Sequence, residues 1–343
     1  MLNDKQIKII KEELDNSRKP IFFFHDDPDG LSSFLLFYRY LKDGKGIPIK
    51  AVPNVNQVYL KKVEEYDPDR IFVLDIALVE QEFIDKVKMN IIWIDHHTPQ
   101  VREKVIYFNP RNNVPSVNVP TPYLCWQVVQ NDLWIAMTGC VGDWYWPDFA
   151  EDFKQKYPDL LDKNVNSVET ALFNSVLGKL VKIFSFNLKG STKDVYQSMK
   201  VLCRVKDPYE VLNQSSAGGK FLYKKFEKIN VLYEKMLSYA KKKDSQDKFL
   251  IYTYSDDKLS LTKDIANELS YLFQDKIIIV GREKDDEVRC SIRARPPINL
   301  QTVFGKAIIG IEGYGGGHEQ AVGCAIKKHN FTRFVENLRK EIS

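Results

Sequence analysis

Closely spaced cysteines and long apolar runs are both missing from this sequence. The five cysteines are odd in number and scattered, which argues against a closed set of disulfides and against a cysteine zinc site. No apolar run approaches the roughly 18 residues that a membrane span needs. We therefore expect a protein of a reducing, intracellular compartment, cytoplasmic and without a membrane partner.

A strong excess of charge of either sign is also missing. Lys and Arg number 50 and Asp and Glu number 46, which leaves a formal net charge of +4. So small an excess argues against a protein that wraps nucleic acid by charge alone, although it permits an anionic substrate. The length of 343 residues, with 44% apolar and 28% charged residues, is typical of two globular domains.

Short apolar, β-rich runs alternate with charged, helix-like stretches in the first half of the chain. The runs cover residues 20–24, 47–52, 70–74 and 90–94. This alternation predicts an α/β domain over 1–190, in which helices cover a parallel sheet and ligands lie beyond the carboxyl ends of the strands. Three of the four runs end directly before an Asp or a His.

The second half of the chain begins with a polar, helical pattern. Residues 220–243 predict a long amphipathic helix with a basic end, within a helical connector over 191–246. A second, smaller α/β domain is expected over 247–343. Its predicted strands are 249–254, 276–280, 288–294 and 321–326, and its predicted helices are about 263–273, 299–308 and 330–342.

The first apolar run is followed by the segment HDDPDG, which begins at His25. Because Pro28 disfavours helix at the residue before it, we expect extended backbone that places His25, Asp27 and Asp29 on one side. The next glycine would permit a tight turn, and one of the two serines after it would cap the following helix. Taken alone, the segment could also be a solvated acidic turn.

Two further apolar runs end in acidic residues. One is followed by Asp75 and the other by Asp95, His96 and His97. Adjacent histidines point in different directions, which suits one metal ligand and one substrate contact. Asp143 follows an apolar run that could be a strand or a buried helix. A single Asp at any of these places would ordinarily be a turn or helix cap, so the argument depends on their accumulation at one sheet edge.

The distribution of histidine supports a shared site. Four of the five histidines lie in these segments or in a glycine-rich run near the C-terminus, and His329 alone lies outside. Mixed Asp and His ligands suit Mn²⁺ or Mg²⁺, and imidazole favours manganese.

The second domain offers residues suited to an anion. Period-two alternation over 287–295 places Arg289, Ser291, Arg293 and Arg295 on one strand face, where guanidinium groups could hold phosphates, although a solvated basic face is the alternative. The glycine run before His318 comprises Gly313, Gly315, Gly316 and Gly317. Its backbone amides can approach an anion closely, so we expect a loop that helps to clamp phosphate and sugar.

These motifs resemble those of a known family. HDDPDG, Asp75, the triplet from Asp95 to His97, and Asp143 resemble the four motifs of the DHH phosphoesterases. SIR, from Ser291 to Arg293, and GGGH, from Gly315 to His318, resemble the accompanying DHHA1 domain. The resemblance implies one metal held by His25, Asp27 and Asp75, and another held by Asp29, Asp75, His96 and Asp143. Asp95 would then orient a histidine, and His97 would meet the scissile phosphate.

The resemblance also implies an activity. It points to a two-metal phosphodiesterase, a compact RecJ-like exonuclease that hydrolyses single-stranded DNA or RNA, or short oligonucleotides, to mononucleotides. In this protein Arg293, Ser291, the glycine run and His318 would bind the substrate from the far side of an interdomain cleft. Replication or repair proteins and a second copy of the chain are candidate partners.

Other members of the family supply the alternatives. A nanoRNase-like enzyme that degrades very short oligonucleotides and also removes nucleotide 3′-phosphates comes second. The short gap between the first His and the first Asp argues against pyrophosphate as the substrate, and no sensory segment points to a cyclic dinucleotide. A catalytically silent replication or repair scaffold would have lost metal ligands, whereas every motif position is filled here.

Overall fold

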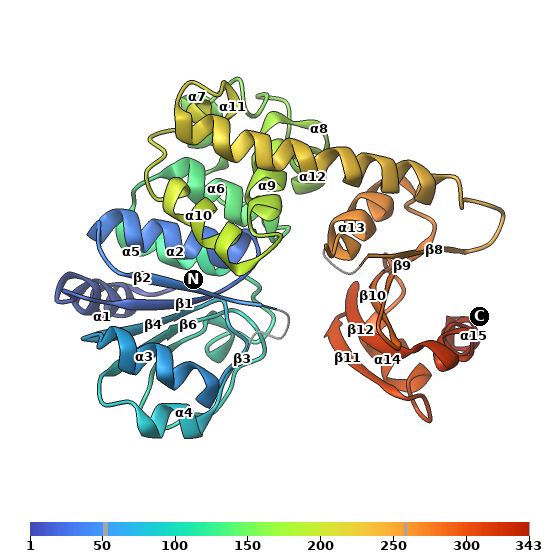
Figure 1. The fold of residues 1–343 in the computed structure, drawn as a ribbon, viewed down its shortest axis with the longest axis horizontal. Helices are drawn as coiled ribbons and strands as arrows, with labels where there is room; N and C mark the ends of the chain where they lie inside the picture. Colours follow the sequence, from blue (N-terminus) through green and yellow to red (C-terminus); the bar gives the residue numbers. More distant parts are fainter. Residues whose placement is uncertain (51–53, 257–258, 343) are drawn as a thin grey trace. The chain divides into compact units, whose positions relative to one another are not determined.

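The computed structural model describes residues 1–50, 54–256 and 259–342. The chain forms two compact units, Met1–Phe226 and Glu227–Ser343, and helix α12 (Ala217–Lys241) crosses the boundary between them (Figure 1). The predicted connector, 191–246, is therefore divided between the two units. All five cysteines are free. In the described part of the chain, no helix combines the length and the apolar character that crossing a membrane requires.

The first unit is built on a five-stranded parallel sheet, as predicted, with strand order β2-β1-β4-β6-β7. The strands are β1 (Ile21–His25), β2 (Lys45–Ile49), β4 (Arg70–Leu74), β6 (Asn90–Ile94) and β7 (Ile106–Phe108). Strand β7 was not predicted, because three residues carry too little pattern. Residues 51 and 52 of the second predicted strand lie outside the described residues.

The central strands are apolar except at one end residue each, because helices cover both faces of the sheet. On one face, Ile71 and Trp93 pack with Val63 of α3 (Leu60–Tyr66) and Phe83 of α4 (Gln81–Lys86). On the other face, Phe24 stacks on Phe34 of α2 (Pro28–Leu41), with ring centroids 4.8 Å apart. Figure 1 shows α3 and α4 on the opposite side of the sheet from α2.

The remaining elements of the first unit are mostly helical. The helices are α1 (Asp4–Asp15), α5 (Thr121–Val129), α6 (Leu133–Gly142), α7 (Ala150–Lys156), α8 (Val168–Asn174), α9 (Val176–Asn187), α10 (Thr192–Leu202) and α11 (Pro208–Leu212). A short parallel pair, β3 (Asn54–Val55) and β5 (Leu78–Val79), lies apart from the main sheet. Helices α5 and α6 pack directly on α2.

The second unit contains a mixed sheet with strand order β11-β12-β10-β9-β8. The strands are β8 (Phe249–Ser255), β9 (Ile277–Lys284), β10 (Glu287–Arg293), β11 (Gly313–His318) and β12 (Ala321–Lys327). The helices are α13 (Thr262–Leu272), α14 (Leu300–Ala307) and α15 (Phe331–Ile342). The hydrophobic core lies on one face, where Val288 and Ile292 of β10 pack with Phe304 of α14 and Phe334 of α15. Helix α13 packs on β9 and β10 and contacts the other face.

The expected glycine loop is wrong, because residues 313–318 form the edge strand β11. Close pairing with β12 explains why glycine is needed there. A Cβ atom on Gly315 would lie 2.5 Å from Cys324 Cβ, and one on Gly317 would lie 2.1 Å from the carbonyl oxygen of Ala321. The run is thus a glycine-rich strand that is exposed along its whole length.

Candidate metal centre

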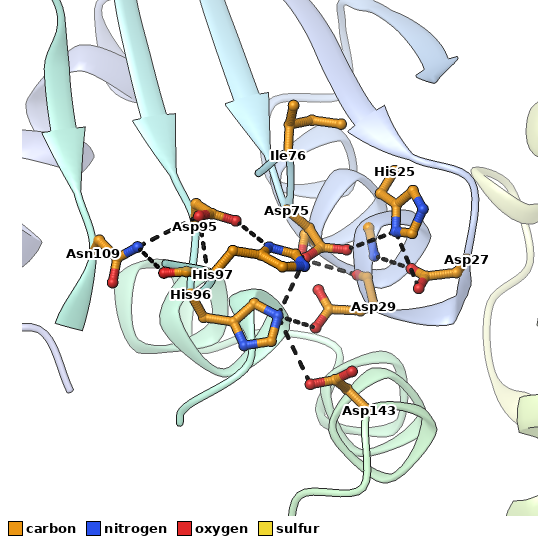
Figure 2. Close-up of polar contacts among 12 residues, drawn as sticks. His25, Asp27, Asp29, Asp75, Ile76, Asp95, His96, His97, Asn109 and Asp143 are labelled. Atoms are coloured by element: carbon orange, nitrogen blue, oxygen red, sulfur yellow. Dashed lines mark hydrogen bonds and ion pairs between the residues drawn. The ribbon is translucent and has the colours of Figure 1, made fainter. Parts of the chain in front are cut away.

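Three neighbouring strands of the first unit deliver polar side chains to one edge of the sheet. His25 is the last residue of β1, Asp75 follows β4, and Asp95 follows β6. Because β1, β4 and β6 are parallel neighbours, their carboxyl ends meet at the same edge. Figure 2 shows these three side chains converging with those of His96 and His97.

Asp29 reaches the centre from a helix and not from extended backbone. Asp27 is extended, as the following proline requires, but α2 begins immediately at Pro28. Asp27 is its N-cap and accepts a hydrogen bond from the backbone N–H of Gly30 at 3.1 Å. The predicted serine cap is therefore wrong, because an Asp followed by Pro already forms a favourable helix start. Gly30 packs against β1, where a Cβ atom would lie 2.3 Å from the carbonyl oxygen of His25.

Asp143 comes to the centre at the C-terminal end of α6, so the apolar run before it is a buried helix. Gly139 allows this approach, because a Cβ atom there would lie 2.6 Å from Cβ of Ser32 on α2. The close contact between α6 and α2 brings Asp143 near Asp29.

The side chains form two groups that share one carboxylate. In the first group, His25 Nδ1 lies 3.1 Å from Asp27 Oδ2 and 3.4 Å from Asp75 Oδ2. In the second group, His96 Nε2 lies 3.4 Å from Asp75 Oδ1. The same nitrogen lies 3.8 Å from Asp29 Oδ2 and 3.8 Å from Asp143 Oδ2. Asp75 thus directs one oxygen to each group, and all six residues expected as ligands lie together.

Asp75 has the backbone conformation of a turn. Its φ of 57° is left-handed, a region in which Asp is tolerated better than most residues. The indole nitrogen of Trp93, on the neighbouring strand β6, donates a 2.8 Å hydrogen bond to the carbonyl oxygen of Ile76. This buried bond holds the turn that directs the Asp75 carboxylate toward both histidines.

The electrostatics of the centre fit divalent cations. Asp29 and Asp75 are 2% and 1% exposed, and none of their four carboxylate oxygens has a hydrogen-bond partner among the described residues. Burial, reinforced by the carboxylates of Asp75 and Asp143, raises the pKa of Asp29 well above its usual value. Buried carboxylates without partners are costly, and hard cations with oxygen and imidazole ligands would relieve that cost.

The carboxylates of the centre raise the pKa of both His25 and His96. Burial opposes protonation of His25, but the carboxylates of Asp27 and Asp75 prevail and raise its pKa well above the usual value. For His96, burial is likewise outweighed by the surrounding carboxylates, with Asp143 the largest contributor. Both rings therefore hold protons that cations would displace.

Asp95 and His97 form a pair beside these groups. His97 Nδ1 lies 2.7 Å from Asp95 Oδ1, and the backbone N–H of His97 donates to Asp95 Oδ2 at 3.0 Å. Asn109, which follows β7, donates to the carbonyl oxygen of His97 at 2.9 Å and to Asp95 Oδ2 at 3.4 Å. Asn109 was not among the predicted site residues because β7 was not predicted, although Asn109 follows its strand just as Asp95 follows β6.

The second unit presents a different kind of surface. On the face opposite the hydrophobic core, strand register aligns β11, β12 and β10 in three rows. The rows are Tyr314–Ala325–Arg289, Gly316–Gly323–Ser291 and His318–Ala321–Arg293. A Cβ atom on Gly316 or on Gly323 would meet no atom within 4 Å. The two glycines of the middle row therefore form an open shelf, and the rows on either side of it each contain an arginine.

The three arginines of the predicted strand face have different surroundings. Arg293 donates from Nε to Asn267 Oδ1 at 2.7 Å, and burial lowers its pKa to about 10, so that it remains charged at neutral pH. Arg289 is partly exposed and lies 3.3 Å from a Glu287 carboxylate oxygen. Arg295 lies beyond the end of β10 and donates to the carbonyl oxygen of Ser270 at 3.3 Å.

Comparison with family descriptions gives two matches, one within each unit. The DHH family, N-terminal domain, matches residues 20–132, and the DHHA1 domain matches residues 246–343. A search of curated protein sequences gave no significant match.

Solved structures resemble the chain along nearly its whole length. RecJ from Thermus thermophilus, in complex with Mn²⁺, has a TM-score of 0.68 at 15% identity, covering 98% of this chain and 54% of that one. An exonuclease RecJ bound to manganese has a TM-score of 0.63 at 14% identity, with 97% and 92% covered. CDC45 from Entamoeba histolytica has a TM-score of 0.58 at 9% identity, with 99% of each chain covered. The chain thus spans about half of the Thermus protein, and identities this low establish a shared fold alone.

Proposed function

This chain joins a DHH-family N-terminal domain to a DHHA1 domain, and from that premise we propose that it is a metal-dependent phosphodiesterase. Its substrate is single-stranded nucleic acid or short oligonucleotides, which it hydrolyses to mononucleotides. The observation that carries the proposal is that Asp75 directs one carboxylate oxygen to His25 and the other to His96, with Asp27, Asp29 and Asp143 beside these rings. The oxygens of Asp29 and Asp75 have no hydrogen-bond partner among the described residues.

The residues of the first unit divide into ligands and orienting groups. His25, Asp27 and Asp75 would hold one cation, and Asp29, Asp75, His96 and Asp143 would hold the other. Bound Mn²⁺ or Mg²⁺ would supply an activated water and neutralise charge on the phosphate.

His97 is proposed to contact the scissile phosphate. Burial opposes its protonation, but Asp95 raises its pKa above the usual value. Asp95 also fixes the ring through Nδ1, which leaves a protonated Nε2 to donate to a phosphate oxygen.

The second unit is proposed to bind the nucleotide. Arg293, Ser291 and His318 border or line the open shelf, and the backbone of Gly315, Gly316 and Gly317 forms its edge strand. The open space over Gly316 and Gly323 suits a flat sugar or base, and the arginine beside it suits a phosphate. Tyr314, which is 57% exposed on the same face, is placed to stack on a base.

The proposal is tested by a time course on single-stranded DNA and RNA labelled at the 5′ or the 3′ end, from dinucleotides to strands of several tens of nucleotides. Reactions contain Mn²⁺ or EDTA, with wild type, Asp75→Ala, and Asp152→Ala as an exposed control. We expect metal-dependent release of mononucleotides that is lost only in Asp75→Ala. The label that is released first gives the polarity.

The length preference separates the two enzymatic candidates. Faster cleavage of long strands supports an exonuclease, whereas activity confined to two to five nucleotides supports a nanoRNase-like enzyme. If the folded wild type cleaves none of these substrates, the catalytic proposal fails and a scaffold role takes its place.

A further inference from the structure

Asn118 lies beside the proposed metal centre and has no role in the proposal above. Its Oδ1 atom is 3.0 Å from Nδ1 of His96. The other ring nitrogen of His96, Nε2, lies within 3.8 Å of carboxylate oxygens of Asp29, Asp75 and Asp143. The ring thus has an amide on one side and only carboxylates on the other.

We infer that Asn118 is a positioning residue that holds the proton of His96 on Nδ1, so that Nε2 offers its lone pair to a divalent cation. This inference rests on the proposed function, because it gives His96 the role of a ligand. A neutral imidazole carries one N–H and one lone pair, and only the nitrogen with the lone pair binds a metal. The carboxylates around Nε2 accept hydrogen bonds, so by themselves they favour a proton on that nitrogen. The amide oxygen of Asn118 favours the opposite tautomer.

The loop that carries Asn118 is anchored at the position this role requires. Asn118 itself is exposed, but the next two residues, Val119 and Pro120, are buried, and Pro120 is the N-cap of α5. Helix α5 packs on α2, the helix whose first turn contains Asp29. The Asn118 amide is therefore anchored through α5 to α2, the helix that carries Asp29, on the other side of the His96 ring.

The test compares Asn118→Leu, which has nearly the same shape but no acceptor, with Asn118→Asp, which keeps the acceptor. Asn113→Leu, at an exposed asparagine of the same loop, is the matched control. Mn²⁺ affinity is measured by electron paramagnetic resonance of the free ion. Residues that orient metal-binding histidines typically change affinity by about 10- to 100-fold. We expect a loss of about tenfold in Asn118→Leu, and an affinity at least that of wild type in Asn118→Asp.

A spectroscopic measurement separates positioning from a general effect on the fold. In ¹⁵N-histidine NMR of the Mg²⁺-saturated wild type, we expect a slowly exchanging proton on His96 Nδ1, kept in Asn118→Asp and lost in Asn118→Leu. Equal Mn²⁺ affinity in wild type and Asn118→Leu would overturn the inference, as would an equal loss in Asn118→Leu and Asn118→Asp.

Failure of the inference can be told apart from failure of the proposed function. If the wild type binds Mn²⁺ but cleaves no nucleic acid, the affinity comparison still decides the role of Asn118. If the wild type cleaves and the Leu variant binds metal as tightly, only the inference fails. A wild type that binds no Mn²⁺ overturns both.

Discussion

Replacing Asp29 by Asn should stabilise the metal-free protein and weaken the stabilisation that Mn²⁺ provides. Both carboxylate oxygens of Asp29 are buried and have no hydrogen-bond partner among the described residues. The repulsion from the carboxylates of Asp75 and Asp143 outweighs the attraction of His96, which lies 3.8 Å away. A buried polar group without a partner costs about 1–3 kcal/mol, and more when charged. The neutral amide of Asn removes the repulsion and can donate to the remaining carboxylates.

The expected size follows from these costs. A gain of about 1–3 kcal/mol corresponds to a Tm increase of roughly 2–12 °C for a unit of this length, at about 2–4 °C per kcal/mol. In the wild type, Mn²⁺ at 100 times its Kd should add about 2.7 kcal/mol. Because Asn is a poorer ligand than a carboxylate, the variant should gain clearly less from the same Mn²⁺ concentration.

The effect depends on pH with a definite sign. Burial first, and then the neighbouring carboxylates, raise the folded-state pKa of Asp29 above its unfolded value, so the native state binds more protons than the unfolded state between the two values. The metal-free wild type therefore loses stability as pH rises through that interval. The advantage of Asp29→Asn should be absent below the unfolded pKa and should grow toward the folded one.

Thermal unfolding in EDTA and in excess Mn²⁺, at several pH values from 4 to 8, measures all three effects. Asp152→Asn, an exposed residue of α7, controls for a change of net charge alone. The reasoning is refuted if Asp29→Asn is less stable than wild type in EDTA at pH 8, or if Mn²⁺ stabilises it as much as wild type.

Three further predictions concern other parts of the chain. Gly323→Val should raise KM for oligonucleotides by about tenfold with little change in Tm, because the new side chain enters open space on the shelf. The control Gly305→Val on α14, also in open space, should leave KM unchanged, and equal KM values for the two variants would contradict a role for the shelf. Asn109→Leu should lower kcat about 10- to 100-fold with little change in Mn²⁺ affinity, because it removes the hydrogen bonds that hold Asp95 and His97. A loss of metal binding would instead show that Asn109 supports the metal ligands. The pKa of Asp247 is lowered to about 2, chiefly by two hydrogen bonds from Arg339. Asp247→Asn should therefore cost at most about 1 kcal/mol of unfolding free energy above pH 4, and in urea unfolding this difference should vanish as pH falls toward 2.

The sheet of the first unit was predictable because its signals are local. Strands β4 and β6 have the bounds expected from the sequence, since each is an apolar run that ends at an acidic residue. Strand β7 was missed because its three residues look like many loops, and only pairing with β6 makes them a strand. The glycine run was misjudged for a related reason, since glycine has a weak preference for strands and β12 alone holds it extended.

The candidate ligands could be found from the sequence because of their residue chemistry, but their geometry could not. Asp and His residues after apolar runs can be recognised in the sequence, and parallel strands necessarily gather their ends at one edge. The route of Asp29 through the first turn of α2, and the approach of α6 that delivers Asp143, depend on tight contacts at Gly30 and Gly139. Such contacts join residues far apart in the chain, so no local pattern reports them.

By itself, therefore, the sequence determined the α/β class, the strand ends and the chemical types gathered there, because these follow from periodicity and residue chemistry. Tertiary structure alone decided that Asp75 directs an oxygen to each of two histidines. It also decided that Asn109 donates to the backbone carbonyl oxygen of His97 and that Asn118 lies beside the ring of His96. The physical reason is that hydrogen bonds and ion pairs act over about 3–4 Å in space, whatever the separation along the chain.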